Sequence, residues 1–223
     1  MRYSIDEILS DVRIILNNNS DDESLLEVGD EGSIEINELI KSKIVDSARD
    51  VFATASLLLM DGGYPMREAD GNNGCLSVKW FGEKGKSGGY VILPSDFMRL
   101  VQWEMSDWEK PVSVPISQSD PQYAQQKSKF IGVRGNPTNP VVALVPHPAG
   151  IALEFYSCSG GDGVYVSSAR YMPIPQVDEE DMIEIPEKCY TAVLYTIAAQ
   201  TAISLNDPSA TVLTEMANSY KRK

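Results

Sequence analysis

The most constraining feature of the chain is a stretch near its C-terminus that contains no charged residue. It runs from Cys189 to Leu205, and its polar positions are only Thr, Gln, Ser and Tyr. A helix that is apolar or small on every side is normally buried on every side. A monomer of 223 residues has room to bury one such helix, but a packed ring of subunits buries it more readily.

The residues around this stretch predict an antiparallel pair of helices. Pro186 stands where the first turn of a helix tolerates a missing N–H group. Asp207 and Pro208 repeat that arrangement, with Asp207 as the N-cap and Pro208 as the first helical residue. The connection between the two helices is then about three or four residues long, which is usual for helix hairpins.

Two further helices are expected near the N-terminus. Ser4 and Glu7 form a capping box ahead of the first, which carries one apolar face. An acidic loop is expected over 20–32. Asn37 is expected to cap the second helix, which runs to about Leu58 before an Asp-Gly-Gly sequence stops it.

The middle third of the chain predicts β-structure. Short segments rich in β-forming residues alternate with turns rich in Gly and Pro, and one or two helical turns are expected over 120–127. Several strands at this spacing indicate an antiparallel sheet or a small sandwich. The expected strands are 76–80, 90–93, 98–105, 141–145, 151–158 and 164–171.

The fold class expected from this order is α+β, with N-terminal helices and a C-terminal helix pair flanking an antiparallel β-rich region. We expect a single domain, 1–223, whose helical part is 1–60 and 182–223 and whose β-rich insertion spans about 75–175. Both helical ends are needed to cover one small core. A division into a helical and a β subdomain is the alternative, although no linker rich in Pro and Ser marks it.

Composition limits the partners of the chain. The content of 43% hydrophobic and 23% charged residues is ordinary for a globular protein. The net charge of −13 argues against a protein that grips duplex DNA, because such affinity depends on Lys and Arg at the phosphates. The run of four acids at 178–181 is typical of a solvated face, and it also complements the positive end of the following helix.

No signal peptide or membrane span is expected. The N-terminus has acids where a signal peptide needs an apolar core, so synthesis in a cytoplasm without export by that route is expected. The stretch 190–206 comes closest to a span, but it is too short and contains several polar groups.

Catalytic and metal-binding constellations are not recognised in the sequence. His147, between two prolines, has no partner at the spacing of a triad or metal site. The three cysteines, Cys75, Cys158 and Cys189, show no Cys-x-x-Cys pairing and favour a reduced compartment without disulfides. We therefore expect no enzyme, no catalytic or metal-ligating residues, and no cofactor.

Three glycine-containing motifs lack a residue or a spacing that the site they suggest requires. The Gly-Lys-Ser at 85–87 lacks the glycine that a phosphate-binding loop needs five positions earlier, where Trp80 stands. The segment 160–163 lacks the spacing of a dinucleotide fingerprint. The segment 70–74 has the composition of a calcium loop, but the twelfth position is Phe81 instead of an acid.

Two segments carry a resemblance to a known family. The first is the terminal helix pair, with Ile-Pro-Glu at 185–187, Ala192, Val193, Tyr195, Ala198, Ala199 and Asp-Pro at 207–208. The second is 89–101, which contains Leu-Pro-Ser-Asp-Phe ahead of a strand. Together with the order of helices and strands, they resemble the head-to-tail adaptor proteins of short-tailed bacteriophages. These are also called tail tubular A or gatekeeper proteins, and the ring proteins of crAss-like phages are similar.

The resemblance implies a structural virion protein that forms a ring of twelve copies between the portal and the tail. Its partners would be the portal protein, a tail hub or further ring proteins, and its own copies. Duplex DNA would pass through the channel without specific binding. The protein would be made in the host cytoplasm and lie in the virion neck or tail. The family carries no catalytic residues, and the long β-rich region sets this chain apart from the better-known adaptors.

A ring of this kind needs two different contact faces on each subunit. One candidate face is the charge-free helix, with Val193, Leu194, Ile197 and Ile203. The other is the second N-terminal helix, with Leu39, Val45 and Phe52. Two alternatives stay open: another phage tail completion or assembly protein, and a monomeric module whose β-region binds a small ligand or a peptide.

Overall fold

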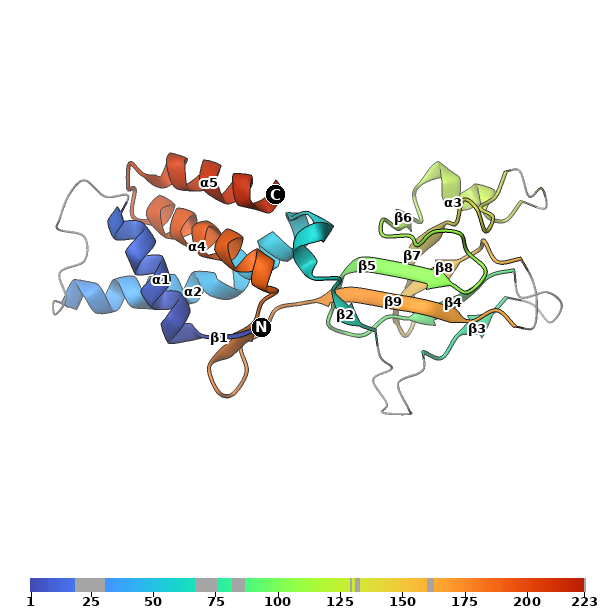
Figure 1. Cartoon of the computed structure of the whole chain (residues 1–223), viewed down its shortest axis with the longest axis horizontal. Helices are drawn as coiled ribbons and strands as arrows, with labels where there is room; N and C mark the ends of the chain where they lie inside the picture. Colours follow the sequence, from blue (N-terminus) through green and yellow to red (C-terminus); the bar gives the residue numbers. More distant parts are fainter. Residues whose placement is uncertain are drawn as a thin grey trace. The chain divides into compact units, whose positions relative to one another are not determined.

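The chain forms a mixed fold of helices and antiparallel sheets, and the expected α+β class is confirmed. It divides into two compact units, whereas a single domain with an insertion was predicted from the sequence. The helical unit contains residues 1–62 and 174–223, and the β unit contains residues 63–173 (Figure 1). The computed structural model describes residues 1–18, 31–66, 76–81, 87–128, 130, 133–159 and 163–222.

The helical unit is built around its charge-free helix. This helix, α4, contacts α1, α2 and α5. The elements of the unit are β1 (Arg2–Ser4), α1 (Ile5–Asn18), α2 (Glu31–Thr54), η1 (Leu57–Met60), β10 (Met182–Glu184), η2 (Glu187–Cys189), α4 (Tyr190–Ser204) and α5 (Ala210–Arg222). The expected helix hairpin is therefore present as α4 and α5.

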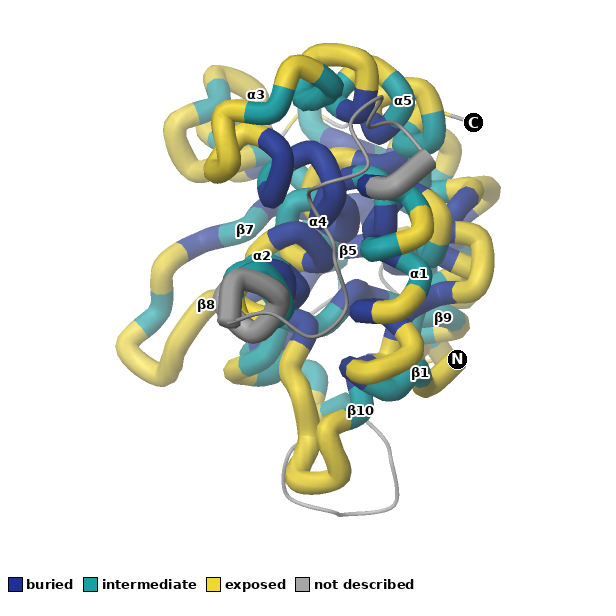
Figure 2. The backbone as a smooth tube through the Cα atoms, turned by 90° about the vertical axis from the view of Figure 1, so that its left-hand side faces the viewer, coloured by how far each residue is buried: buried dark blue, intermediate teal, exposed yellow. Residues whose placement is uncertain are grey.

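The neighbours within the chain bury α4 without a second subunit. Nine of its fifteen residues are buried, and Figure 2 shows the buried stretches along this helix. Four of the nine are alanines, whose small side chains allow close approach of the neighbouring helices. The charge-free sequence is thus explained by packing inside the helical unit, so it does not by itself require a ring.

The starts of the helices match the sequence prediction in part. The Ser4 hydroxyl accepts a hydrogen bond from the Glu7 N–H at 3.1 Å, as the capping box requires. The Asp207 carboxylate accepts one from the Ser209 N–H at 2.7 Å, just before α5. The prediction for Asn37 is wrong, because α2 already begins at Glu31. An asparagine inside a helix costs only a fraction of a kcal/mol, about 0.7 at most, so it does not force a boundary.

A two-stranded sheet joins the chain's first residues to the segment before α4. β1 pairs antiparallel with β10, with Tyr3 opposite Ile183. The N-terminal ammonium donates a hydrogen bond to the Ile185 carbonyl at 2.8 Å. This pairing between distant segments was not expected from the sequence.

The β unit contains two sheets and one short helix. The three-stranded sheet has the order β2-β9-β5, and the five-stranded sheet has the order β3-β4-β8-β7-β6 with one parallel pair, β6 and β7. Its elements are β2 (Tyr64–Pro65), β3 (Lys79–Trp80), β4 (Gly89–Ile92), β5 (Phe97–Met105), β6 (Ile116–Ser117), α3 (Pro121–Gln125), β7 (Val142–His147), β8 (Gly150–Phe155) and β9 (Val166–Pro173). The strands predicted from the sequence lie at these places, although β3 keeps only two residues of its segment.

The two sheets share one core. Trp103 of β5 and Phe155 of β8 lie in it with ring centroids 5.8 Å apart, and both side chains are fully buried. Because side chains alternate along a strand, Glu154 and Tyr156, which flank Phe155 in the sequence, face away from this core. They lie on the outer surface of the five-stranded sheet, where α3 is also found.

Candidate functional site

A row of aromatic rings crosses the outer surface of the five-stranded sheet. Tyr90 of β4 lies 5.3 Å from the His147 ring and 5.9 Å from Phe81, measured between centroids. Phe81 stacks on Tyr156 at 5.6 Å, and Tyr156 meets Tyr123 of α3 edge-on at 6.2 Å. The row therefore joins residues from five separate segments of the chain.

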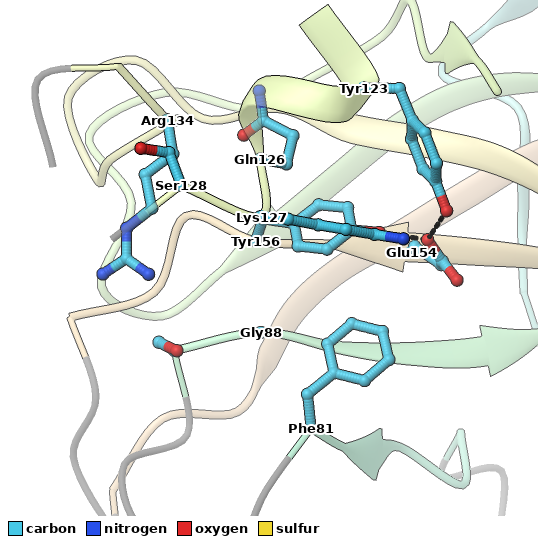
Figure 3. A pocket seen from close by; sticks show the side chains of 10 residues that line it. Phe81, Gly88, Tyr123, Gln126, Lys127, Ser128, Arg134, Glu154 and Tyr156 are labelled. Atoms are coloured by element: carbon cyan, nitrogen blue, oxygen red, sulfur yellow. Dashed lines mark hydrogen bonds between the residues drawn. The ribbon is translucent and has the colours of Figure 1, made fainter. Parts of the chain in front are cut away.

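One end of this row forms a pocket of about 370 Å³. We call it the aromatic pocket. Figure 3 shows Tyr123 entering from the side of α3 and Phe81 from the opposite side, with Glu154 and Tyr156 between them. A volume of this size falls within the roughly 300–1,000 Å³ of small-molecule sites. Its lining residues are Phe81, Ser87, Gly88, Tyr123, Gln126, Lys127, Ser128, Arg134, Glu154 and Tyr156.

The polar centre of the aromatic pocket is the Glu154 carboxylate. The Tyr123 hydroxyl donates a hydrogen bond to its Oε2 atom at 2.8 Å, and the Tyr156 hydroxyl donates to the same atom. Burial, together with the hydrogen bond to Glu154, raises the pKa of Tyr156. Burial is also the main cause that raises the pKa of Tyr123. Both phenols therefore stay protonated at neutral pH and serve as donors to the carboxylate.

The loop after α3 supplies the pocket's positive groups. The Lys127 ammonium lies 5.5 Å from the centre of the Tyr123 ring, within reach of a cation–π interaction. Gln126 shapes this loop, because its side chain donates to the Gln122 carbonyl at 3.0 Å and accepts from the Gly135 N–H at 2.8 Å. Arg134, at the other end of the loop, also lines the pocket.

At Gly88, which lines the pocket, the backbone lies close to the backbone of Phe155. A Cβ atom added to Gly88 would lie 2.5 Å from the Phe155 carbonyl oxygen, so no larger residue fits without a shift of the backbone.

The sequence prediction missed the aromatic pocket. The only local signal for it is the alternation at 153–156, which turns Glu154 and Tyr156 outward, while Phe81 and Tyr123 come from distant segments.

The seven residues predicted from the sequence for an interface do not share one surface. Leu39 and Val45 are half-buried, and Ile203 is 58% exposed. Four others lie in the core of the helical unit, where they cannot form a contact face as the chain is folded: Phe52, Val193, Leu194 and Ile197. The interface prediction fails for these four residues because their side chains are buried where the helices of this unit pack together.

The remaining candidate residues have structural surroundings. The His147 Nδ1 atom accepts a hydrogen bond from the Ala149 N–H at 3.1 Å in the turn between β7 and β8. Cys158 and Cys189 are buried, and the Cys189 thiol donates a hydrogen bond to the Leu59 carbonyl at 3.2 Å. Burial raises the pKa of Cys158 to about 12. Cys75, the segment 70–74, most of the Gly-Lys-Ser motif and residues 160–162 lie outside the described residues.

The described part of the chain holds no group of three or more His, Cys, Asp or Glu side chains arranged to bind a metal ion. Among the same residues, every helix is too short or too polar to cross a membrane. Neither the comparison with protein-family models nor the comparison with curated proteins finds a match to this chain.

Proposed function

We propose that the chain is a structural subunit of a short-tailed bacteriophage, which forms a ring between the portal and the tail and continues the DNA channel. The observation that carries this proposal is the order of elements. Two helices precede the β unit and a helix hairpin follows it, which is the order of elements on which the resemblance to the adaptor family rests, while the long β unit sets the chain apart from the better-known adaptors. The Leu-Pro-Ser-Asp-Phe segment forms the turn from β4 into β5, where the Phe97 N–H donates to the Pro94 carbonyl at 3.0 Å.

The distribution of charge supports this proposal. The helical unit has 22 Asp and Glu residues against nine Lys and Arg, while the β unit has ten of each. The whole net charge of −13 therefore belongs to the helical unit. An acidic wall repels phosphates, so duplex DNA would pass along it without binding.

The exposed end of the α4–α5 hairpin offers a contact face. Ile203 and Leu205 lie at the end of α4, and Val212 lies in α5; they are 58%, 37% and 53% exposed. Exposed apolar groups of this kind mark interaction sites when they gather on one surface. In a ring they would meet a different face of the next subunit, because a head-to-tail contact is heterologous.

Assembly on the cognate portal tests the proposal. The purified protein is incubated with portal rings and imaged by electron microscopy, and we expect a closed ring of twelve copies on one end of the portal. The protein without the portal should cause no gel shift of duplex DNA. A protein that stays monomeric and fails to dock on the portal would overturn the proposal.

A second candidate is a monomeric ligand-binding module, which the aromatic pocket favours. A preformed pocket with aromatic walls and a few polar groups is the usual form of a small-molecule site. The two candidate functions are separated by measuring the mass of the protein in solution with the portal present, because an adaptor joins the portal and a ligand-binding module does not. A monomer that binds a small ligand and ignores the portal would support the module.

A further inference from the structure

We propose that the aromatic pocket of the β unit is a saccharide-binding site. Three of its walls are rings from separate segments: Phe81 after β3, Tyr123 in α3, and Tyr156 after β8. Such rings bring large and rigid apolar faces at a low cost in conformational entropy. A sugar ring has apolar C–H faces of similar size, which pack on aromatic rings.

The polar groups of the pocket complement sugar hydroxyls. Both tyrosine hydroxyls donate to Glu154 Oε2, so the Oε1 atom has no hydrogen-bond donor among the described residues. The Oε1 atom and the tyrosine oxygens can accept, while Lys127 and Arg134 can only donate. A saccharide hydroxyl donates one hydrogen bond and accepts others, so it can use both kinds of group at once.

The same charges disfavour other ligands. A phosphate group would meet the Glu154 carboxylate at the centre of the pocket. Single-stranded nucleic acid combines stacking with a positively charged groove, whereas the β unit as a whole has no net charge. A cationic ligand would meet Lys127 and Arg134. The balance of charges therefore favours a neutral ligand rich in hydroxyl groups.

The site is suited to binding and not to hydrolysis. Glycoside hydrolysis ordinarily uses a pair of carboxyl groups about 5–10 Å apart on either side of the bond. Among the described lining residues, Glu154 is the only carboxylate, and two phenols already hold it. Binding by this pocket does not depend on ring assembly, so it holds for an adaptor subunit and for a monomeric module alike.

Titration with sugars tests the site in the full chain. The probes are the methyl glycosides of glucose, galactose, mannose and N-acetylglucosamine and their short oligosaccharides, followed by saturation-transfer NMR and calorimetry. We expect saturable binding of at least one sugar. Phe81→Ala should weaken it about tenfold, and Glu154→Gln by about tenfold to a hundredfold, because a hydrogen bond to a charged group is lost.

Matched variants control for folding. Tyr165→Ala removes an aromatic ring that is 65% exposed elsewhere in the β unit, and Glu109→Gln neutralises an exposed acid outside the pocket. Both should bind the sugar as the original chain does. Glu154→Gln keeps the size of the side chain, so it remains informative if Phe81→Ala fails to fold.

The proposal is overturned by any of three results. They are the absence of saturable binding by every sugar at tens of millimolar, unchanged affinity in a folded Glu154→Gln variant, and binding of a nucleotide or a quaternary ammonium compound in place of the sugars. Failure here leaves docking on the portal unaffected, so the two proposals are judged separately.

Discussion

Arg2 and Asp178 connect the start of the chain to the turn that precedes β10. The Arg2 guanidinium contacts the Asp178 carboxylate. The same carboxylate accepts hydrogen bonds from the N–H groups of Glu180 at 3.0 Å and Met182 at 2.9 Å. The hydrogen bond from Met182, followed by that from Arg2, lowers the pKa of Asp178. A single side chain thus holds both a turn and a contact between distant segments.

This geometry predicts a pH dependence of stability. A carboxyl group whose pKa is lower in the folded state stabilises the fold above its unfolded pKa of about 3.9, and this contribution is lost as the pH falls through the folded value. Asp178→Asn should therefore lower the melting temperature at pH 7, and the difference from the original chain should shrink below about pH 4. Thermal unfolding followed by circular dichroism measures both.

Glu179→Gln is the control for this prediction, because it removes the same charge from an exposed neighbour. It should leave the pH profile of the melting temperature close to that of the original chain. An equal effect of Asp178→Asn at pH 3 and at pH 7 would show that the charge of Asp178 does not contribute.

At the scale of elements, the start of α5 depends on one side chain. The Asp207 carboxylate accepts from the Ser209 N–H, and the Asp207 carbonyl accepts from the Ala210 N–H at 3.1 Å. Asp207→Ala should cost about 1 kcal/mol in the free energy of unfolding. Asp207→Asn keeps an N-cap oxygen and should cost much less. Urea unfolding compares the two, and equal losses would contradict the capping role.

Helix α4 offers a matched pair of isoleucines that separates core packing from subunit contact. Ile197 is fully buried, whereas Ile203 is 58% exposed. Ile197→Ala should destabilise the protein by about 2–5 kcal/mol, because it leaves a cavity. Ile203→Ala should change the free energy of unfolding by no more than about 0.5 kcal/mol.

The same pair also tests the proposed contact face. Under the adaptor proposal, Ile203→Ala should reduce ring formation on the portal while the monomer keeps its stability. Normal assembly of this variant would remove Ile203 from the interface. A large loss of monomer stability in Ile203→Ala would instead contradict its exposed position.

In the whole molecule, the β unit is inserted in the sequence between residues 62 and 174 of the helical unit. Tyr64 of β2 pairs with Tyr171 of β9, so the chain enters and leaves the β unit on adjacent antiparallel strands. Opposite residues in such a pair lie about 5 Å apart. The helices α1, α2, α4 and α5 all belong to residues outside the insertion.

A chain in which a short Gly-Ser linker replaces residues 63–173 should therefore fold. We expect a helical circular dichroism spectrum with more helix per residue than the intact chain, and cooperative thermal unfolding. The intact chain is the reference. An unfolded or aggregated product would show that the helical unit needs the β unit for its stability.

Features that depend on a few neighbouring residues could be predicted from the sequence. The hydrogen bonds that Ser4 accepts from the Glu7 N–H and Asp207 accepts from the Ser209 N–H agree with predictions from three- or four-residue patterns, although α5 begins at Ala210, two residues after the predicted start at Pro208. The strands of the β unit were predicted from alternation and turn residues, and the α+β class followed from their order. Where a local pattern was ambiguous, as at Asn37, the predicted boundary was wrong because tertiary packing outweighs a weak preference.

The surroundings of each helix and strand could not be predicted in this way, because they depend on how the whole chain packs. A charge-free helix must be buried, but its sequence does not tell whether the same chain or another subunit buries it, and here α1, α2 and α5 do so. The β1–β10 pair joins residues about 180 positions apart, and the aromatic pocket joins Phe81, Tyr123 and Tyr156. Such contacts arise from the simultaneous packing of many segments, and for that reason no local pattern encodes them.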